Sequence, residues 1–140
     1  TLRLRISVAA MFHSLVSRML RQGFSVTVLP STLDEECYAD EMRKADIVLL
    51  PYDVEKYLGR GSGVVVDAVA AGCGLLYTQG MGNSEVLNHG NARAFREIKE
   101  IPKALDELIM GNFWAKPVAE ARKALEALYA ESARILETRI

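Results

Sequence analysis

A short apolar run that stops at a proline constrains the fold of this chain more than any other feature of its sequence. The run is Ile47–Leu50, and Pro51 follows it directly. Four consecutive apolar residues suit a strand that is buried on both faces of a parallel sheet. Proline ends such a strand because it has no N–H group to donate. A second run of this kind, Gly74–Tyr77, comes later, so the sequence predicts parallel strands with helices between them.

Glycine-rich turns follow both of these predicted strands. After the first strand, Ser62 is expected to cap a helix that runs from Gly63 to about Gly72. After the second strand, the turn at 78–83 leads into a short helix that begins near Ser84. In doubly wound sheets, ligands bind beyond the carboxyl ends of the strands. Both turns are therefore expected at one ligand-binding edge.

The rest of the chain alternates between the patterns of strands and helices. We therefore expect a single α/β domain over residues 1–140, with an open parallel Rossmann-like sheet of about five strands, helices on both faces and a long C-terminal helix. The other predicted strands are Leu2–Val8, Phe24–Leu29 and about Ala94–Ile98, and the other predicted helices are Ala9–Arg21, Leu33–Lys44 with Ser31 or Thr32 as its cap, Ile101–Met110 and Pro117–Thr138.

Charge and cysteine content argue against several classes of function. A formal net charge of -1 gives no broad basic field, so we expect neither a nucleic-acid partner nor an anionic membrane partner. The apolar segment 64–77 is interrupted by Asp67 and is too short to span a bilayer. Cys37 and Cys73 form no metal-type pair, which predicts free thiols in a reducing, cytoplasmic compartment. The chain begins at Thr1, so we expect a processed chain or an excised fragment.

Candidate ligand-binding groups gather around the first of these turns. The N–H groups of Gly63 and Val64 would form an anion seat at the start of a helix, and Arg60 would add a forked donor. Tyr57 offers a ring for stacking on a base or sugar, although loop tyrosines often only pack on their neighbours. There is no P-loop lysine, and the dinucleotide glycine spacing fails at Val64. A polar or phosphorylated ligand is predicted without a standard nucleotide fingerprint.

Two acidic residues each have a functional and a structural interpretation. Asp67 lies four residues after Gly63, so its carboxylate would point toward the ligand edge and accept hydrogen bonds from a ribose diol. Glu85 follows Gly82 at the start of the next helix and would contact the same ligand. Both would also be stabilised there by the helix dipole without any ligand. The chain has no zinc pattern, serine elbow or paired carboxylates, so we assign neither a metal site nor catalytic residues.

In order and spacing, these motifs resemble the donor-binding, C-terminal domain of GT-B fold glycosyltransferases of the group-1, family-4-like class. That family has a strand ending in Leu-Pro, then a helix rich in Glu-Ala-x-Ala-x-Gly, then a strand and a Gly-Gly-x-x-Glu turn. The likeness covers about residues 33–91. The matching strings here are Ala45–Pro51, Ser62–Gly72 and Met81–Glu85.

The resemblance assigns roles to individual residues. It implies that Asp67 holds the ribose of a nucleoside-diphosphate sugar. The carboxylate with which the family contacts the donor sugar would fall on Gly59, so it is missing here. In the string Tyr57-x-x-Arg60-x-Ser62-Gly63, Arg60 and Ser62 are hypothesised to take over donor contacts. The donor is then the expected ligand, and no further cofactor is expected.

The resemblance also implies that parts of the enzyme lie outside this sequence. The family's diphosphate-binding Arg and Lys precede the first strand, and nothing before Leu2 supplies them. Its acceptor-binding N-terminal domain is missing as well. Because the transferase reaction occurs between the two domains, this N-terminally incomplete donor domain is expected to be inactive alone.

Two other interpretations stay open. A nucleoside deoxyribosyltransferase-like enzyme would need a nucleophilic carboxylate on the central helix, which only Asp67 could supply. A non-catalytic Rossmann-like binding module would use the helix 117–138 as a homodimer interface.

Overall fold

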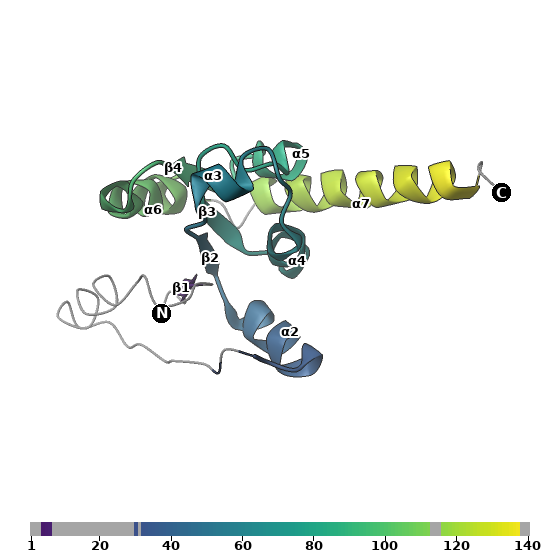
Figure 1. Ribbon diagram of the computed structural model, residues 1–140, viewed down its shortest axis with the longest axis horizontal. Helices are drawn as coiled ribbons and strands as arrows, with labels where there is room; N and C mark the ends of the chain where they lie inside the picture. The colour runs from purple at the N-terminus through teal and green to yellow at the C-terminus, as the bar shows by residue number, and fades with distance from the viewer. Residues whose placement is uncertain (1–3, 7–29, 31, 113–115, 138–140) are drawn as a thin grey trace.

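The computed structural model describes residues 4–6, 30, 32–112 and 116–137 of the chain. Figure 1 shows the elements in this part as alternating strands and helices. The strands are β1 (Leu4–Ile6), β2 (Ile47–Leu50), β3 (Gly74–Thr78) and β4 (Ala92–Phe95). The helices are α2 (Glu35–Lys44), α3 (Val54–Tyr57), α4 (Gly63–Ala71), α5 (Ser84–Leu87), the 3-10 turn η1 (Ile98–Glu100), α6 (Ile101–Met110) and α7 (Lys116–Glu137).

The strands form one open sheet in which every pair is parallel. Their order is β1-β2-β3-β4, which confirms the predicted α/β class with a parallel sheet. The described residues contain four strands, so the expected count of about five is not confirmed. The predicted strand Phe24–Leu29 and the predicted helix Ala9–Arg21 lie outside the described residues.

Both faces of this sheet are covered by apolar side chains from helices. In β2, Val48 and Leu50 join a cluster on one face with residues of α2, α4, α5 and α7. Ile47 and Leu49 join a second cluster on the other face, mainly with α6. All four β2 side chains are fully buried, as the unbroken apolar run predicts.

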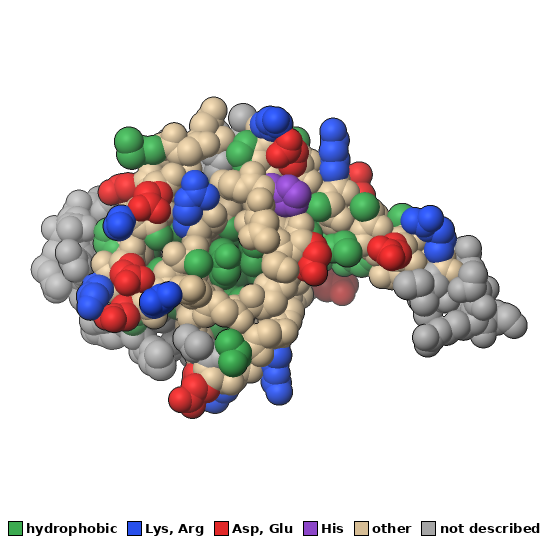
Figure 2. Space-filling view, turned by 90° about the horizontal axis from the view of Figure 1, so that it is seen from above, with side chains coloured by type: hydrophobic (Ala, Val, Ile, Leu, Met, Phe, Trp, Pro, Cys, Tyr) green, Lys and Arg blue, Asp and Glu red, His purple; other side chains and the backbone are tan. Residues whose placement is uncertain are grey.

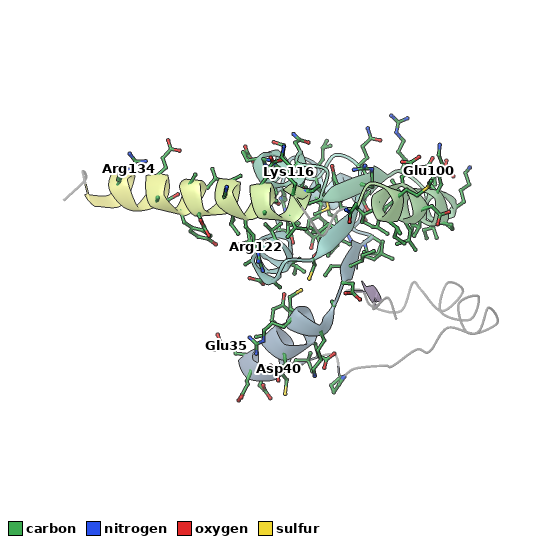
Figure 3. All side chains as sticks on the ribbon, turned by 180° about the vertical axis from the view of Figure 1, so that it is seen from behind. Glu35, Asp40, Glu100, Lys116, Arg122 and Arg134 are labelled. Atoms are coloured by element: carbon green, nitrogen blue, oxygen red, sulfur yellow. The ribbon has the colours of Figure 1, made fainter. Side chains whose placement is uncertain are left out.

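The buried side chains described for the long last helix lie in its first half. Val118, Ala121 and Leu125 are buried, whereas Leu128, on the same predicted stripe, is 38% exposed. Arg122 reaches from α7 to the C-terminal end of α4, where it donates to the carbonyl oxygens of Val69 and Ala70 (Figure 3). Beyond this contact α7 extends past the rest of the molecule (Figure 1).

Several predicted boundaries differ from the observed ones. The cap of α2 is Asp34, whose side chain accepts the N–H of Cys37, and not Ser31 or Thr32. The predicted strand at Ala94–Ile98 begins earlier, because residues 92–95 pair with β3, and 98–100 form the turn η1. The loop after β2 contains the unpredicted helix α3, which Asp53 caps.

No helix in the described ranges combines the length and the apolar character needed to cross a membrane.

Candidate functional site

The two turns are neighbours because the strands before them end at neighbouring positions in the sheet. Leu50, the last residue of β2, is paired with Tyr77, and β3 ends one residue later at Thr78. The buried hydroxyl of Thr78 donates to the Leu50 carbonyl oxygen at 3.3 Å. The loops that leave β2 and β3 therefore start side by side, as the sequence predicts.

Further along, the loops are joined by backbone hydrogen bonds. The Gly59 N–H donates to the Gly80 carbonyl oxygen and the Gly82 N–H donates to the Arg60 carbonyl oxygen, both at 2.9 Å. Leu58 and Met81 form an isolated antiparallel bridge next to these contacts. A Cβ atom at Gly82 would lie 2.9 Å from the Arg60 carbonyl carbon, so only glycine fits without a backbone shift. We call this contact between residues 58–62 and 79–83 the loop junction.

The N-terminus of α4 emerges from the loop junction with unused hydrogen-bonding groups. Ser62 occupies the cap position, as predicted, but its side chain makes no capping hydrogen bond. Its own N–H donates to Asn83 Oδ1 at 2.7 Å. Among the described residues, the N–H groups of Gly63 and Val64 have no hydrogen-bond partner. These two donors, at the positive end of the α4 dipole, are the groups that would bind an anion.

An aromatic pair and an arginine lie beside this helix end. The rings of Tyr52 and Tyr57 are stacked, with centroids 4.3 Å apart, and the Tyr52 hydroxyl is 3.3 Å from Ser62 Oγ. The exposed Arg60 side chain forms no hydrogen bond or ion pair with the described part of the chain. Tyr57 and Arg60 line a shallow, open depression together with Glu55, Lys56 and Leu58. The structure thus brings Tyr57, Arg60 and Ser62 together at one edge.

Asp67 lies further from this group than the sequence-based interpretation supposes. Its carboxylate is exposed and accepts a hydrogen bond from the Tyr38 hydroxyl of α2 at 3.0 Å. The side chain therefore faces α2 instead of standing free above the α4 N-terminus. Its ribose-binding role stays a prediction.

Gly82 lies in the loop after β3, and Glu85 lies in the helix α5 that follows this loop. Gly82 serves the junction itself, whereas Glu85 is exposed in the first turn of α5. The backbone carbonyl oxygen of Glu85 is 2.8 Å from His89 Nε2, so this ring nitrogen is hydrogen-bonded within α5 and its end. Glu85 thus keeps its predicted position at the start of a helix, and its contact with a ligand stays a prediction.

Asn83 is the site residue that sequence reasoning missed. It has a positive φ of 68° and bonds to Ser62 across the loop junction. Asparagine tolerates the left-handed conformation better than most residues, so an Asn between a glycine turn and a helix was the available signal.

One face of the molecule is mixed in charge. Figure 2 shows acidic and basic side chains interspersed over the face that it presents, without a large area of one sign. Within the described residues, no group of three or more His, Cys, Asp or Glu side chains is arranged to hold a metal ion. Arg60 lines its depression together with Lys56 and Glu55, so side chains of both signs lie there.

Comparisons with protein families, with curated proteins and with solved structures find no match to this chain.

Proposed function

We propose that this chain is the nucleotide-sugar donor-binding domain of a GT-B glycosyltransferase, active only together with an acceptor-binding domain. The observation that carries the proposal is the loop junction, in which Arg60 and Ser62 directly precede the unpaired N–H groups of Gly63 and Val64. A diphosphate needs such a set of donors around its oxygens. The carboxyl edge of a parallel sheet is also the expected place for a nucleotide.

In this proposal each group has one task in binding. The α4 backbone donors and the Ser62 hydroxyl bind phosphate oxygens, and Arg60 adds a cation that is not already paired with a described carboxylate. Tyr57 contacts the base or the sugar, while Asp67 and Glu85 accept hydrogen bonds from ribose and sugar hydroxyls. Because Gly59 has no carboxylate, the site holds the nucleotide part more firmly than the sugar.

The test is a calorimetric titration of the chain with UDP and GDP, before and after Arg60→Ala. A hydrogen bond from a charged donor contributes about 1.5–3 kcal/mol, so the affinity of the variant should fall about tenfold or more. Arg43→Ala is the matched control, since it removes an exposed arginine at the end of α2, before β2 begins. Equal binding heats for wild type and Arg60→Ala would count against the proposal.

A second candidate function is a non-catalytic module that forms a homodimer through α7. The free part of α7 exposes Leu128 and 60% of Tyr129, which supports this reading. Sedimentation over a concentration series would show a dimer, and no stabilisation by nucleoside diphosphates would favour this module over a donor domain. Stabilisation by free deoxynucleosides would instead favour the deoxyribosyltransferase-like enzyme with Asp67 as its nucleophile.

A further inference from the structure

Asn83 uses its side chain across the loop junction instead of at its own helix. It stands at the cap position of α5, yet it makes no capping hydrogen bond there. Its Oδ1 atom accepts the N–H of Ser62 at 2.7 Å. Within the described residues, the hydrogen bonds from Gly59 to Gly80 and from Gly82 to Arg60 join the same two loops through backbone groups alone. Asn83 thus supplies a side-chain contact to the loop after β2.

The bond from Asn83 begins a chain of contacts toward the aromatic pair. Ser62 is partly buried, and its Oγ atom is 3.3 Å from the Tyr52 hydroxyl. Tyr52 in turn stacks on Tyr57. A Cβ atom added at Gly61 would lie 3.4 Å from the Asn83 amide, so the amide is closely packed against the loop. A change at Asn83 would therefore reach groups on the far side of the site.

We propose that Asn83 is the positioning residue of the candidate site. It fixes the Ser62 backbone against the loop that follows β3. In this way it keeps Arg60, Ser62 and Tyr57 in one arrangement before any ligand binds. Its effect on ligand affinity rests on the proposed function, whereas its effect on the loop does not. Preorganised groups bind more tightly because less ordering remains to be done on binding.

The backbone at this position limits which residues can do this. Because φ is 68° at position 83, the residue there must accept the left-handed conformation. It must also carry an acceptor atom for the Ser62 N–H. Glycine keeps the conformation and loses the acceptor. Aspartate keeps both, although it adds a negative charge. The pair Asn83→Gly and Asn83→Asp therefore separates the hydrogen bond from the backbone conformation.

The experiment measures amide hydrogen exchange at Ser62 by NMR, together with thermal midpoints and UDP affinity. In Asn83→Gly we expect exchange at Ser62 to rise about tenfold or more, with a similar midpoint, and UDP affinity to fall about fivefold or more. In Asn83→Asp exchange should stay slow; its added charge excludes it from the UDP comparison. The control Asn88→Gly makes the same change at an exposed position of the α5 end and should alter neither Ser62 exchange nor UDP affinity.

The outcomes separate this inference from the proposed function. Unchanged Ser62 exchange in Asn83→Gly overturns it, and so does faster exchange with an unchanged UDP affinity. If wild-type protein does not bind UDP or GDP at all, the proposed function fails. Faster exchange at Ser62 in Asn83→Gly, with slow exchange kept in Asn83→Asp, would then still support the hold of Asn83 on the loop.

Discussion

The N-termini of α2 and α4 differ in capping and in the charge of their first turns. The α2 end is closed by its own side chain: Asp34 accepts the Cys37 N–H at 2.8 Å, and Glu35 and Glu36 add negative charge to the first turn. The α4 end has a serine that does not cap and no acidic residue in its first turn. The acidic first turn of α2 would repel an anion, whereas the first turn of α4 carries no such charge. Of the two helix ends, the α4 end is therefore the better suited to the anion that the proposed function requires.

The change expected to have the largest effect is Gly82→Ala, which would disrupt the loop junction beside α4. The new Cβ atom would meet backbone atoms of Arg60 and Gly61 at 2.9–3.0 Å, and overpacking of this kind typically costs about 1–3 kcal/mol. Chemical denaturation should show that loss of stability, and UDP titration should show loss of binding.

Gly63→Ala is the matched control for stability. A Cβ atom at Gly63 has no neighbour within 4 Å, so this variant should be as stable as the wild type or slightly more stable. A junction that tolerated Gly82→Ala as well as Gly63→Ala would not be holding the two loops together.

The next effect in size is expected from making the α4 end resemble the α2 end. Ser62→Asp places a carboxylate at the α4 cap, where it would stabilise the helix and repel phosphate. UDP affinity measured by calorimetry should fall about tenfold or more while the thermal midpoint holds or rises. The reverse exchange, Asp34→Ser, should leave UDP affinity unchanged. Undiminished binding by Ser62→Asp would remove the distinction between the two helix ends.

The smallest effect concerns stability alone and depends on pH. Asp34→Ala should lower the thermal midpoint at pH 7 by a few degrees, because the α2 end loses its cap, whereas Ser62→Ala should not. The hydrogen bond from the Cys37 N–H lowers the pKa of Asp34 from its usual 3.8. Its stabilisation is therefore complete above the unfolded pKa and is lost as the pH falls through the lower, folded pKa.

Thermal melts of wild type and Asp34→Ala from pH 7 down to about pH 2 would check this, since about pH 2 lies below the usual range for an aspartate. The gap between the two proteins should close on acidification. A gap of constant size would mean that the ionised carboxylate is not what closes the α2 end.

The strands and helices with continuous patterns could be predicted from the sequence, and the local details of the site could not. The buried run Ile47–Leu50 and the helix Ile101–Met110 were predicted with their observed bounds, since burial on both faces and amphipathic spacing depend on nearby residues. The strand near Ala92 was displaced because its limits are set by pairing with β3, a partner that sequence patterns do not reveal.

The site shows the same division. The sequence predicted glycine turns at one edge and a cap position at Ser62, both of which are local signals. The Asn83 bond to Ser62 and the Tyr38 bond to Asp67 join segments 21 and 29 residues apart. Such contacts depend on the folded arrangement, so neither the role of Asn83 nor the orientation of Asp67 followed from spacing.

The attachment of α7 by its first half couples the position of this helix to that of α4. Its 22 residues give a rod of about 33 Å, and the buried side chains that fasten it, Val118 to Leu125, lie in its first half. Arg122 joins that half to the last carbonyl groups of α4, at the opposite end from the loop junction. A displacement of the C-terminal half of α7 would therefore reach α4, whose other end forms the candidate site, through Arg122 and through the packed side chains of the first half.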